Sequence, residues 1–133
     1  MLFTDQMNRT IRLDSAPKRI VSLVPSQTEL LYDLGLEKEV VGITKFCIHP
    51  NNWFQNKTRV GGTKNVNFEQ LDKLNPDLII ANKEENTESE IKQLMKGYQV
   101  WISDIQNLED ALEMIILIGE VTQTTRKASR IIF

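Results

Sequence analysis

The stretch that decides the fold runs from Arg19 to Gly35 and reads RIVSLVPSQTELLYDLG. Its first part, IVSLV, predicts a short apolar strand that stops at Pro25, and a helix begins directly after it. Ser26 and Glu29 have the spacing of a capping box, in which both side chains satisfy free backbone N–H groups at a helix start. Gly35 stands where a left-handed helix cap is expected. The stretch therefore predicts a strand joined at once to a capped helix.

The same junction recurs along the chain. Further cap-like pairs, each followed by apolar residues at helical spacing, are Asn67 with Gln70, Thr87 with Glu90, and Asn107 with Asp110. Further short strands are expected at residues 40–43, 77–81 and 99–102. This strand–helix alternation predicts an α/β fold, a mostly parallel sheet with helices on both faces. The strand ends of such a sheet collect on one rim, where ligands commonly bind.

The remaining segments give the outline of the domain. Residues 2–4 and 10–13 flank a polar stretch and predict a small N-terminal β-hairpin. Residues 44–66 predict a long irregular loop, and structureless loops longer than about 12–15 residues are often functional. The last helix is expected to break near residues 119–125 and to resume through Ile132.

The composition excludes some classes of function but does not identify one. The chain has 133 residues, 41% hydrophobic and 26% charged, which is typical of one globular domain. The net charge of −2 gives no indication of a nucleic-acid partner. No apolar run approaches the roughly 20 residues of a membrane span, and the N-terminus lacks the pattern of a secretory signal. The single cysteine, Cys47, excludes an internal disulfide.

The candidate ligand-binding residues lie in the loops after the predicted strands. Helix N-termini at such a rim carry partial positive charge and free N–H donors, which suit an anionic group, although each cap also has a purely stabilising role. Trp53 offers an apolar wall for a flat ligand or, alternatively, a lid over the core. The predicted ligand-binding set is Pro25, Ser26, Gln27, Lys45, Phe46, Trp53, Gly62, Lys64, Asn65, Lys83, Glu84 and Asn86.

Metal binding and catalysis have less support in the residue pattern. Cys47 and His49 are metal-ligand types two positions apart, but two such ligands do not close a site. Carboxylates would have to come from elsewhere on the rim, and Glu84 and Glu85 are candidates. The alternative is a cysteine buried as a small hydrophobe and a histidine that packs or caps. Residues 61–65 lack the spacing of a phosphate-binding P-loop, and no nucleophile elbow is present. We therefore expect a binding protein rather than an enzyme.

Several motifs together resemble a known family. RIVSLVPSQTELLYDLGLEKEVVGIT, CIHP, VGG and LDKLNPDLIIA resemble the N-terminal lobe of the helical-backbone metal receptor superfamily, the substrate-binding proteins of ABC importers for cobalamin, haem and ferric siderophores. The chain looks closest to the cobalamin branch, whose members often carry a Cys and a Pro after the second strand. The resemblance implies one lobe of a two-lobe fold, a metal chelate held in the cleft between lobes, and an ABC permease as partner.

The resemblance also sets the expected domain organisation. Residues 1–123 would form the N-terminal lobe and residues 124–133 the start of the helix that joins the lobes, with the second lobe absent. Members are periplasmic or lipid-anchored, yet no signal sequence is found here, so a cytoplasmic location stays open. The alternative function is therefore a cytoplasmic metal-binding or sensory protein that kept the receptor fold without transport. Self-association is expected through the final apolar residues, Ile131, Ile132 and Phe133.

Overall fold

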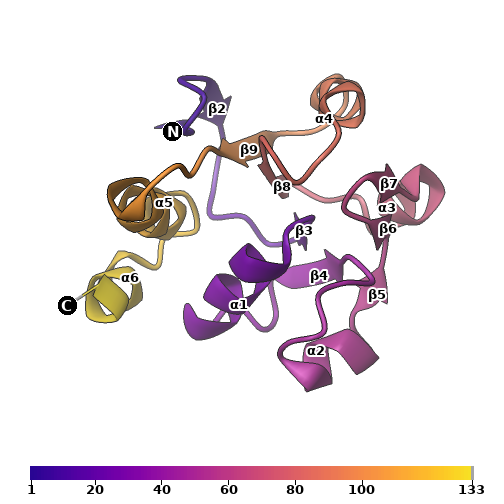
Figure 1. The fold of residues 1–133 in the computed structure, drawn as a ribbon, viewed down its shortest axis with the longest axis horizontal. Coiled ribbons are helices and arrows are strands. Elements are labelled where there is room, and N and C mark those ends of the chain that lie inside the picture. The colour runs from indigo at the N-terminus through magenta and orange to yellow at the C-terminus, as the bar shows by residue number, and fades with distance from the viewer. Residues whose placement is uncertain (133) are drawn as a thin grey trace.

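A computed structural model describes residues 1–132 and contains a five-stranded parallel sheet (Figure 1). Its strand order is β5–β4–β3–β8–β9, and every neighbouring pair is parallel. Within this sheet the chain first forms the central strand β3, then adds β4 and β5 on one side of it, and finally β8 and β9 on the other side. The strands are β3 (Ile20–Ser22), β4 (Val40–Ile43), β5 (Thr58–Arg59), β8 (Leu78–Asn82) and β9 (Val100–Ser103). The α/β prediction with a mostly parallel sheet is confirmed.

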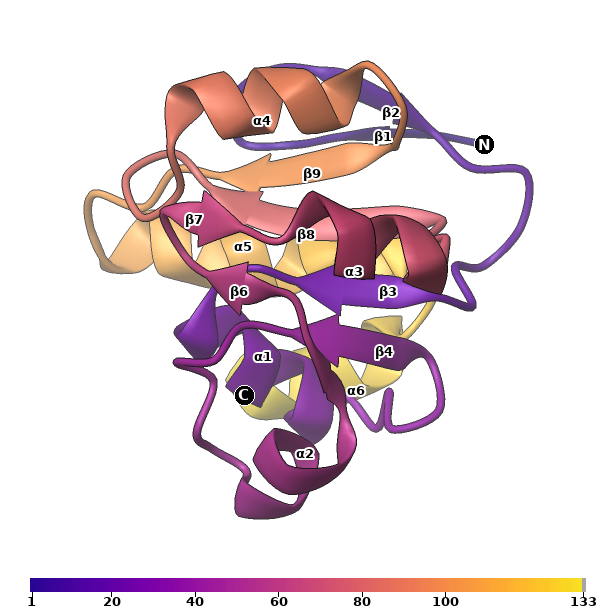
Figure 2. The ribbon, with the colours of Figure 1, turned by 90° about the vertical axis from the view of Figure 1, so that its right-hand side faces the viewer.

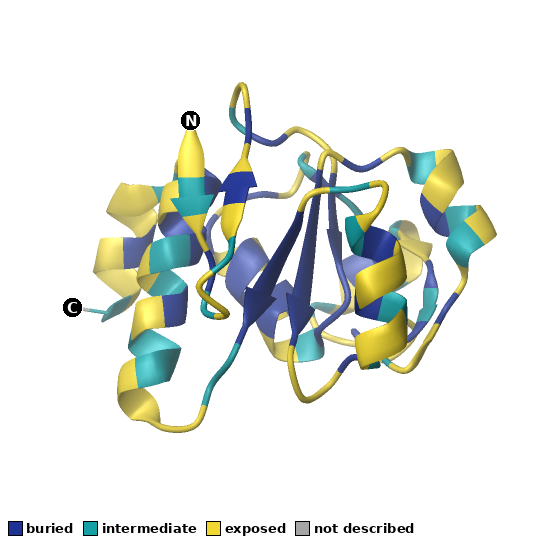
Figure 3. Ribbon diagram, turned by 90° about the horizontal axis from the view of Figure 1, so that it is seen from above, coloured by how far each residue is buried: buried dark blue, intermediate teal, exposed yellow. Residues whose placement is uncertain are grey.

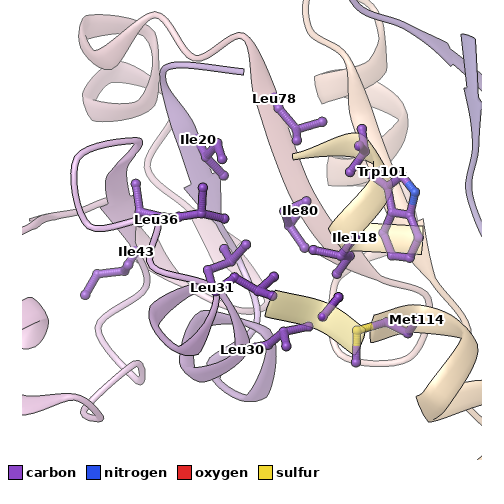
Figure 4. Packing of buried hydrophobic residues seen from close by; sticks show 14 of the residues in the cluster. Ile20, Leu30, Leu31, Leu36, Ile43, Leu78, Ile80, Trp101, Met114 and Ile118 are labelled. Atoms are coloured by element: carbon purple, nitrogen blue, oxygen red, sulfur yellow. The ribbon is translucent and has the colours of Figure 1, made fainter. Parts of the chain in front are cut away.

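The three strands β3, β8 and β9 are buried on both faces, which explains why their sequences are mostly continuous apolar runs rather than alternating ones (Figure 3). Ile20 and Ile80 contribute to one core cluster with residues of α1 and α5 (Figure 4). Val21 and Ile79 contribute to a second cluster with residues of α3 and α4. The helices are α1 (Pro25–Asp33), α2 (Asn51–Asn56), α3 (Phe68–Leu74), α4 (Glu88–Met95), α5 (Leu108–Val121) and α6 (Thr125–Ile132).

The predicted N-terminal hairpin is present as β1 (Leu2–Thr4) and β2 (Thr10–Arg12), which pair antiparallel. The turn between them covers the free edge of β9. Ile102 N donates to Asp5 Oδ2 at 3.1 Å, and Gln6 N donates to Ile102 O at 3.1 Å. Arg9 Nη1 donates to Val100 O at 3.0 Å. The turn thus supplies the hydrogen-bonding groups that another strand would offer, and it blocks pairing of this edge with a second chain.

Residues 44–66 are not the irregular loop that the sequence predicted. They contain α2, the edge strand β5, and a small hairpin of β6 (Gly61–Gly62) and β7 (Asn65–Val66), seen side-on in Figure 2. The prediction was wrong because these strands have two residues each, too few for a period-2 pattern to be recognised. Their pairing depends on tertiary contacts rather than on local propensity.

The predicted helix caps were correct at two starts and differ at two others. Asn67 and Asn107 are N-caps whose side chains accept hydrogen bonds from the N–H three residues on. At α1, Pro25 takes the first helical position, so Val24 is the N-cap and Ser26 lies within the first turn without capping. Thr87 is the N-cap of α4, but its side chain makes no cap bond.

The predicted helix ends agree more closely with the structure. Gly35 adopts φ 77° after α1, in the left-handed region, as expected of a helix-ending glycine. The last helix breaks between Val121 and Thr125, as predicted. Of the residues predicted for self-association, Ile131 is 42% exposed, and Phe133 lies outside the described residues. Within residues 1–132, no helix has both the length and the apolar character needed to cross a membrane.

Candidate ligand-binding rim

The carboxyl ends of the five strands open onto one edge of the sheet, which we call the carboxyl rim. At its centre, β3 and β8 are neighbours, but the chain leaves β3 toward α1 on one face and leaves β8 toward α4 on the other (Figure 1). Such a switch point leaves a crevice in open α/β sheets. A depression of about 420 Å³ lies here, lined by Pro25, Phe46, Thr63, Lys64, Glu84 and Glu85.

Phe46 supplies the apolar wall of the depression. Its side chain is 54% exposed although it is a large aromatic residue. Lys45 Nζ lies 5.3 Å from the centre of the ring. Gly62 makes room for the ring, because a Cβ there would lie 3.2 Å from Phe46 Cε2. An exposed ring held against a glycine offers a flat apolar surface to a ligand.

Charged side chains of both signs line the rest of the rim. Lys64 Nζ donates to the carbonyl of Glu84 at 3.3 Å, and Lys83 forms an ion pair with Asp104 at 3.8 Å. The backbone N–H groups of Glu84 and Glu85 are held by Asn82 Oδ1 at 2.8 and 2.9 Å. The turn after β8 is therefore fixed from below while its two carboxylates remain exposed.

A buried layer of polar side chains lies beneath the rim. On the β9 side, Ser103 Oγ accepts from Asn82 Nδ2 at 2.9 Å and from Gln27 Nε2. On the β4 side, the Cys47 thiol lies 3.1 Å from the hydroxyl oxygens of both Thr28 and Thr44. These contacts hold the loops in fixed positions and satisfy polar groups that burial would otherwise leave unpaired.

Apart from Trp53, the predicted ligand-binding residues separate into three groups. Pro25, Phe46, Lys64 and Glu84 line the central depression, and Lys45 and Gly62 contact Phe46. Ser26 and Lys83 are exposed at the rim, and Asn65 is exposed on β7. Gln27 and Asn86 are buried and bond to neighbouring loops.

Trp53 lies away from the depression. Its side chain is 1% exposed, it belongs to the core cluster under α1, and its Nε1 donates to Glu37 Oε2 at 2.9 Å. Tyr32 packs edge-on against it at 5.4 Å between ring centres. The interpretation of Trp53 as a ligand wall is therefore corrected. It covers the core, which was the alternative.

The predicted metal pair is divided between two environments. Cys47 is 1% exposed and its thiol contacts two threonine hydroxyls. His49 is exposed, beside a separate hollow lined by Glu29, Tyr32, Asp33 and Pro50. In the described part of the chain, no three His, Cys, Asp or Glu side chains are grouped as metal ligands would be. The arrangement fits the alternative in which the cysteine is a small buried side chain.

Three hydroxyl residues under the rim were missed by sequence reasoning. Ser22 and Ser103 end β3 and β9, Thr44 directly follows β4, and all three are fully buried. A usable signal was present, because each is a polar residue at the carboxyl end of an otherwise apolar strand.

A second and larger hollow, of about 520 Å³, lies at the opposite ends of the strands. Arg12, Asp14, Asp77 and Tyr98 are among its lining residues. Tyr98 donates its hydroxyl to Asp72, and this hydrogen bond, with burial and the charge of Asp72, raises the pKa of Tyr98 to about 12. The two ends of the sheet therefore differ in their construction.

A lobe with an open switch point and a polar layer beneath it defines an α/β ligand-binding protein, and comparison with known proteins agrees. A family model described as Periplasmic binding protein matches residues 20–132. The chain therefore belongs to the periplasmic binding protein family, a family of ligand-binding proteins rather than enzymes, as predicted. This also confirms the resemblance to receptors of the cobalamin, haem and siderophore group.

Two curated relatives are informative. An uncharacterized ABC transporter substrate-binding lipoprotein, YvrC of Bacillus subtilis, is 36% identical over 132 residues, covering 96% of this chain and 41% of the relative. A vitamin B12-binding protein of Vibrio vulnificus is 30% identical over 103 residues, covering 76% of this chain and 37% of the relative. The chain thus spans about 40% of the length of these relatives.

Solved structures show the same lobe. The vitamin B12-binding protein BtuF of Vibrio cholerae matches 86% of this chain and 45% of its own with a TM-score of 0.78 and 26% identity. The molybdate-binding protein MolA of Haemophilus influenzae has a TM-score of 0.88 over 98% of this chain and 48% of its own, but 18% identity, so it supports the fold alone.

Proposed function

We propose that this chain is the ligand-binding lobe of a substrate-binding component of an ABC importer, and that its ligand is a metal chelate. The observation that carries the proposal is the depression at the β3–β8 switch point, with the exposed ring of Phe46 as its apolar wall. A permease is the partner that this function requires. The relatives at 30% identity or more, named as ABC substrate-binding and vitamin B12-binding proteins, support it.

Among metal chelates we propose cobalamin before haem or a ferric siderophore. The depression combines an apolar face with charges of both signs, which come from Lys64 and from Glu84 and Glu85. The corrin ring of cobalamin is apolar on its face and carries primary amides at its edge, which both donate and accept hydrogen bonds. Haem carries anionic carboxylates, and among the lining residues the two glutamates that would repel them outnumber the one lysine, Lys64, that would attract them.

We further propose that residues 1–123 form one lobe and that residues 124–133 begin the helix leading to a second one. The break after Val121 and the new helix from Thr125 support this division. Since a ligand pocket usually buries most of its ligand, the single rim would contact one side of the chelate and bind it weakly.

The test is calorimetric titration of this chain and of the complete gene product with cyanocobalamin, hemin and ferric siderophores. We expect the complete gene product to bind cyanocobalamin more tightly than this chain and more tightly than the other two ligand classes. Tighter hemin binding would replace cobalamin as the ligand. Absence of binding to every chelate by the complete gene product would refute the function itself.

A further inference from the structure

Asn86 occupies the fork where β3 and β8 separate. Its side chain is 4% exposed, and it hydrogen-bonds to three segments of the chain. Oδ1 accepts from Asn82 N at 2.8 Å, while Nδ2 donates to Leu23 O at 3.1 Å and to Thr63 O at 2.8 Å. Both amide protons and the oxygen are thus engaged.

The strand geometry explains why a side chain is needed at this point. Ser22 pairs with Ile80, and Leu23 N still donates to Ile80 O at 2.9 Å. Beyond that bond the two chains diverge to opposite faces of the sheet, so the carbonyl of Leu23 loses its ladder partner. Asn86 replaces that partner, because a buried carbonyl without a hydrogen bond is costly.

The third bond of Asn86, to Thr63 O, connects it to the turn of the β6–β7 hairpin. Two neighbours at the start of α4 hold the same hairpin: Thr87 Oγ1 donates to Lys64 O at 3.4 Å, and Glu90 Oε2 accepts from Val66 N at 2.9 Å. Thr87 and Glu90 are the pair that the sequence predicted to cap α4, and in the structure their side chains bond to the hairpin. Of these three side chains, Asn86 is the one whose bonds also reach the end of β3.

We infer that Asn86 is a positioning residue that assembles the ligand depression without contacting the ligand. Its three bonds fix the ends of the three segments that carry Pro25, Lys64 and Glu84, all lining residues. The inference rests on the proposed function. It also changes the role predicted for Asn86 from a ligand contact to a support beneath the ligand.

The first test needs no substitution and no ligand. Hydrogen exchange of side-chain amide protons, followed by NMR on this chain, is expected to be at least roughly tenfold slower for Asn86 than for Asn52, which is exposed on α2. Equal exchange rates for the two side chains would overturn the inference. Because cyanocobalamin is absent, this result is independent of whether the proposed function is correct.

The second test is Asn86→Asp, which keeps the shape and the acceptor oxygen. It replaces the amide nitrogen, which donates to two carbonyl groups, with one oxygen that faces both of them. At about pH 7.5 we expect backbone exchange in residues 61–66 to accelerate and cyanocobalamin affinity of the complete gene product to fall roughly tenfold or more. Burial raises the pKa of a carboxyl, so we expect this side chain to take up a proton as the pH is lowered, to regain one donor and to recover part of the affinity. Asn86→Ala has no such donor and shows no recovery.

Asn86→Asp and Asn86→Ala are compared at the same pH. Because both variants retain Lys64, Lys83, Glu84 and Glu85, titration of these groups changes the affinity of both alike and cancels in the comparison. Asn52→Asp, on an exposed site, controls for an added charge. Unchanged exchange and affinity in Asn86→Asp would overturn the inference. Faster exchange in a protein whose parent form binds no cyanocobalamin would instead overturn the proposed ligand and keep the role of Asn86 in holding the loops.

Discussion

The two ends of the sheet contain hollows of similar size but are built differently. The amino-end hollow of about 520 Å³ is the larger, and the carboxyl-rim depression measures about 420 Å³. At the amino end, Asp77 accepts from the N–H groups of Lys18 and Arg19, so its carboxylate fixes the entry of the chain into β3. At the carboxyl rim, the structural bonds are made by buried side chains, and Phe46 above them remains exposed.

The contrast shows that the support beneath a hollow is more informative than its volume. A ligand site needs surface groups that are free to bind and a rigid layer that holds them in place. The carboxyl rim has both, with Ser103 and Asn86 in the buried layer and Phe46 at the surface. Three helices also begin there, α1, α4 and α5, so the positive ends of their dipoles lie at the same rim.

The largest expected effect comes from removing a hydroxyl of the buried layer. Ser103→Ala leaves the amide donors of Asn82 and Gln27 without their shared acceptor, and each unsatisfied buried donor costs about 1–3 kcal/mol. We expect the free energy of unfolding to fall by about 2–4 kcal/mol in urea denaturation. A loss below about 0.5 kcal/mol, the range of a neutral surface change, would show that the buried layer contributes little.

The next effect separates ligand binding from stability. Phe46→Ala removes the exposed ring, so we expect cyanocobalamin affinity to fall roughly tenfold, while unfolding changes by less than about 0.5 kcal/mol. Phe54→Ala is the matched control, because Phe54 lies on α2 and contacts Arg59 rather than the depression. Equal affinity losses in the two variants would count against the carboxyl rim as the site.

The sequence predicted the fold well because its signals are local. Asn67 and Asn107 cap their helices through neighbours three residues away, and the apolar strands needed only their own composition to be recognised. The site was predicted as a set of loops, and four of its residues do line the depression. The roles of the other predicted residues depend on tertiary burial, which local sequence does not reveal. No neighbour in sequence indicates that Trp53 covers the core or that Asn86 bonds to Leu23.

A smaller loss is expected at the amino end. Asp77→Ala removes the acceptor for two backbone N–H groups, but these are exposed and water replaces the carboxylate, so unfolding should lose about 1 kcal/mol. Asp14→Ala is the control, since its carboxylate is 91% exposed, although it forms a 3.7 Å ion pair with Arg12. Cyanocobalamin affinity is expected to stay unchanged in both. A fall in affinity would transfer the ligand site to the amino-end hollow.

The smallest effect is a pH dependence confined to the amino end. The hydrogen bond to Asp72 raises the pKa of Tyr98 from 10.0 to about 12, so the folded protein keeps the phenolic proton over a range in which the unfolded chain loses it. Stability from this group is present below pH 10.0 and is lost as the pH rises toward 12.

Tyr98→Phe should therefore show a shallower fall of the melting temperature over this range than the parent chain. Tyr32→Phe, which removes the hydroxyl from the ring packed on Trp53 and keeps the ring, should keep the parent slope. If the slopes of the parent and Tyr98→Phe coincide, the hydroxyl of Tyr98 does not hold its proton through Asp72, and the alkaline loss of stability arises elsewhere in the chain.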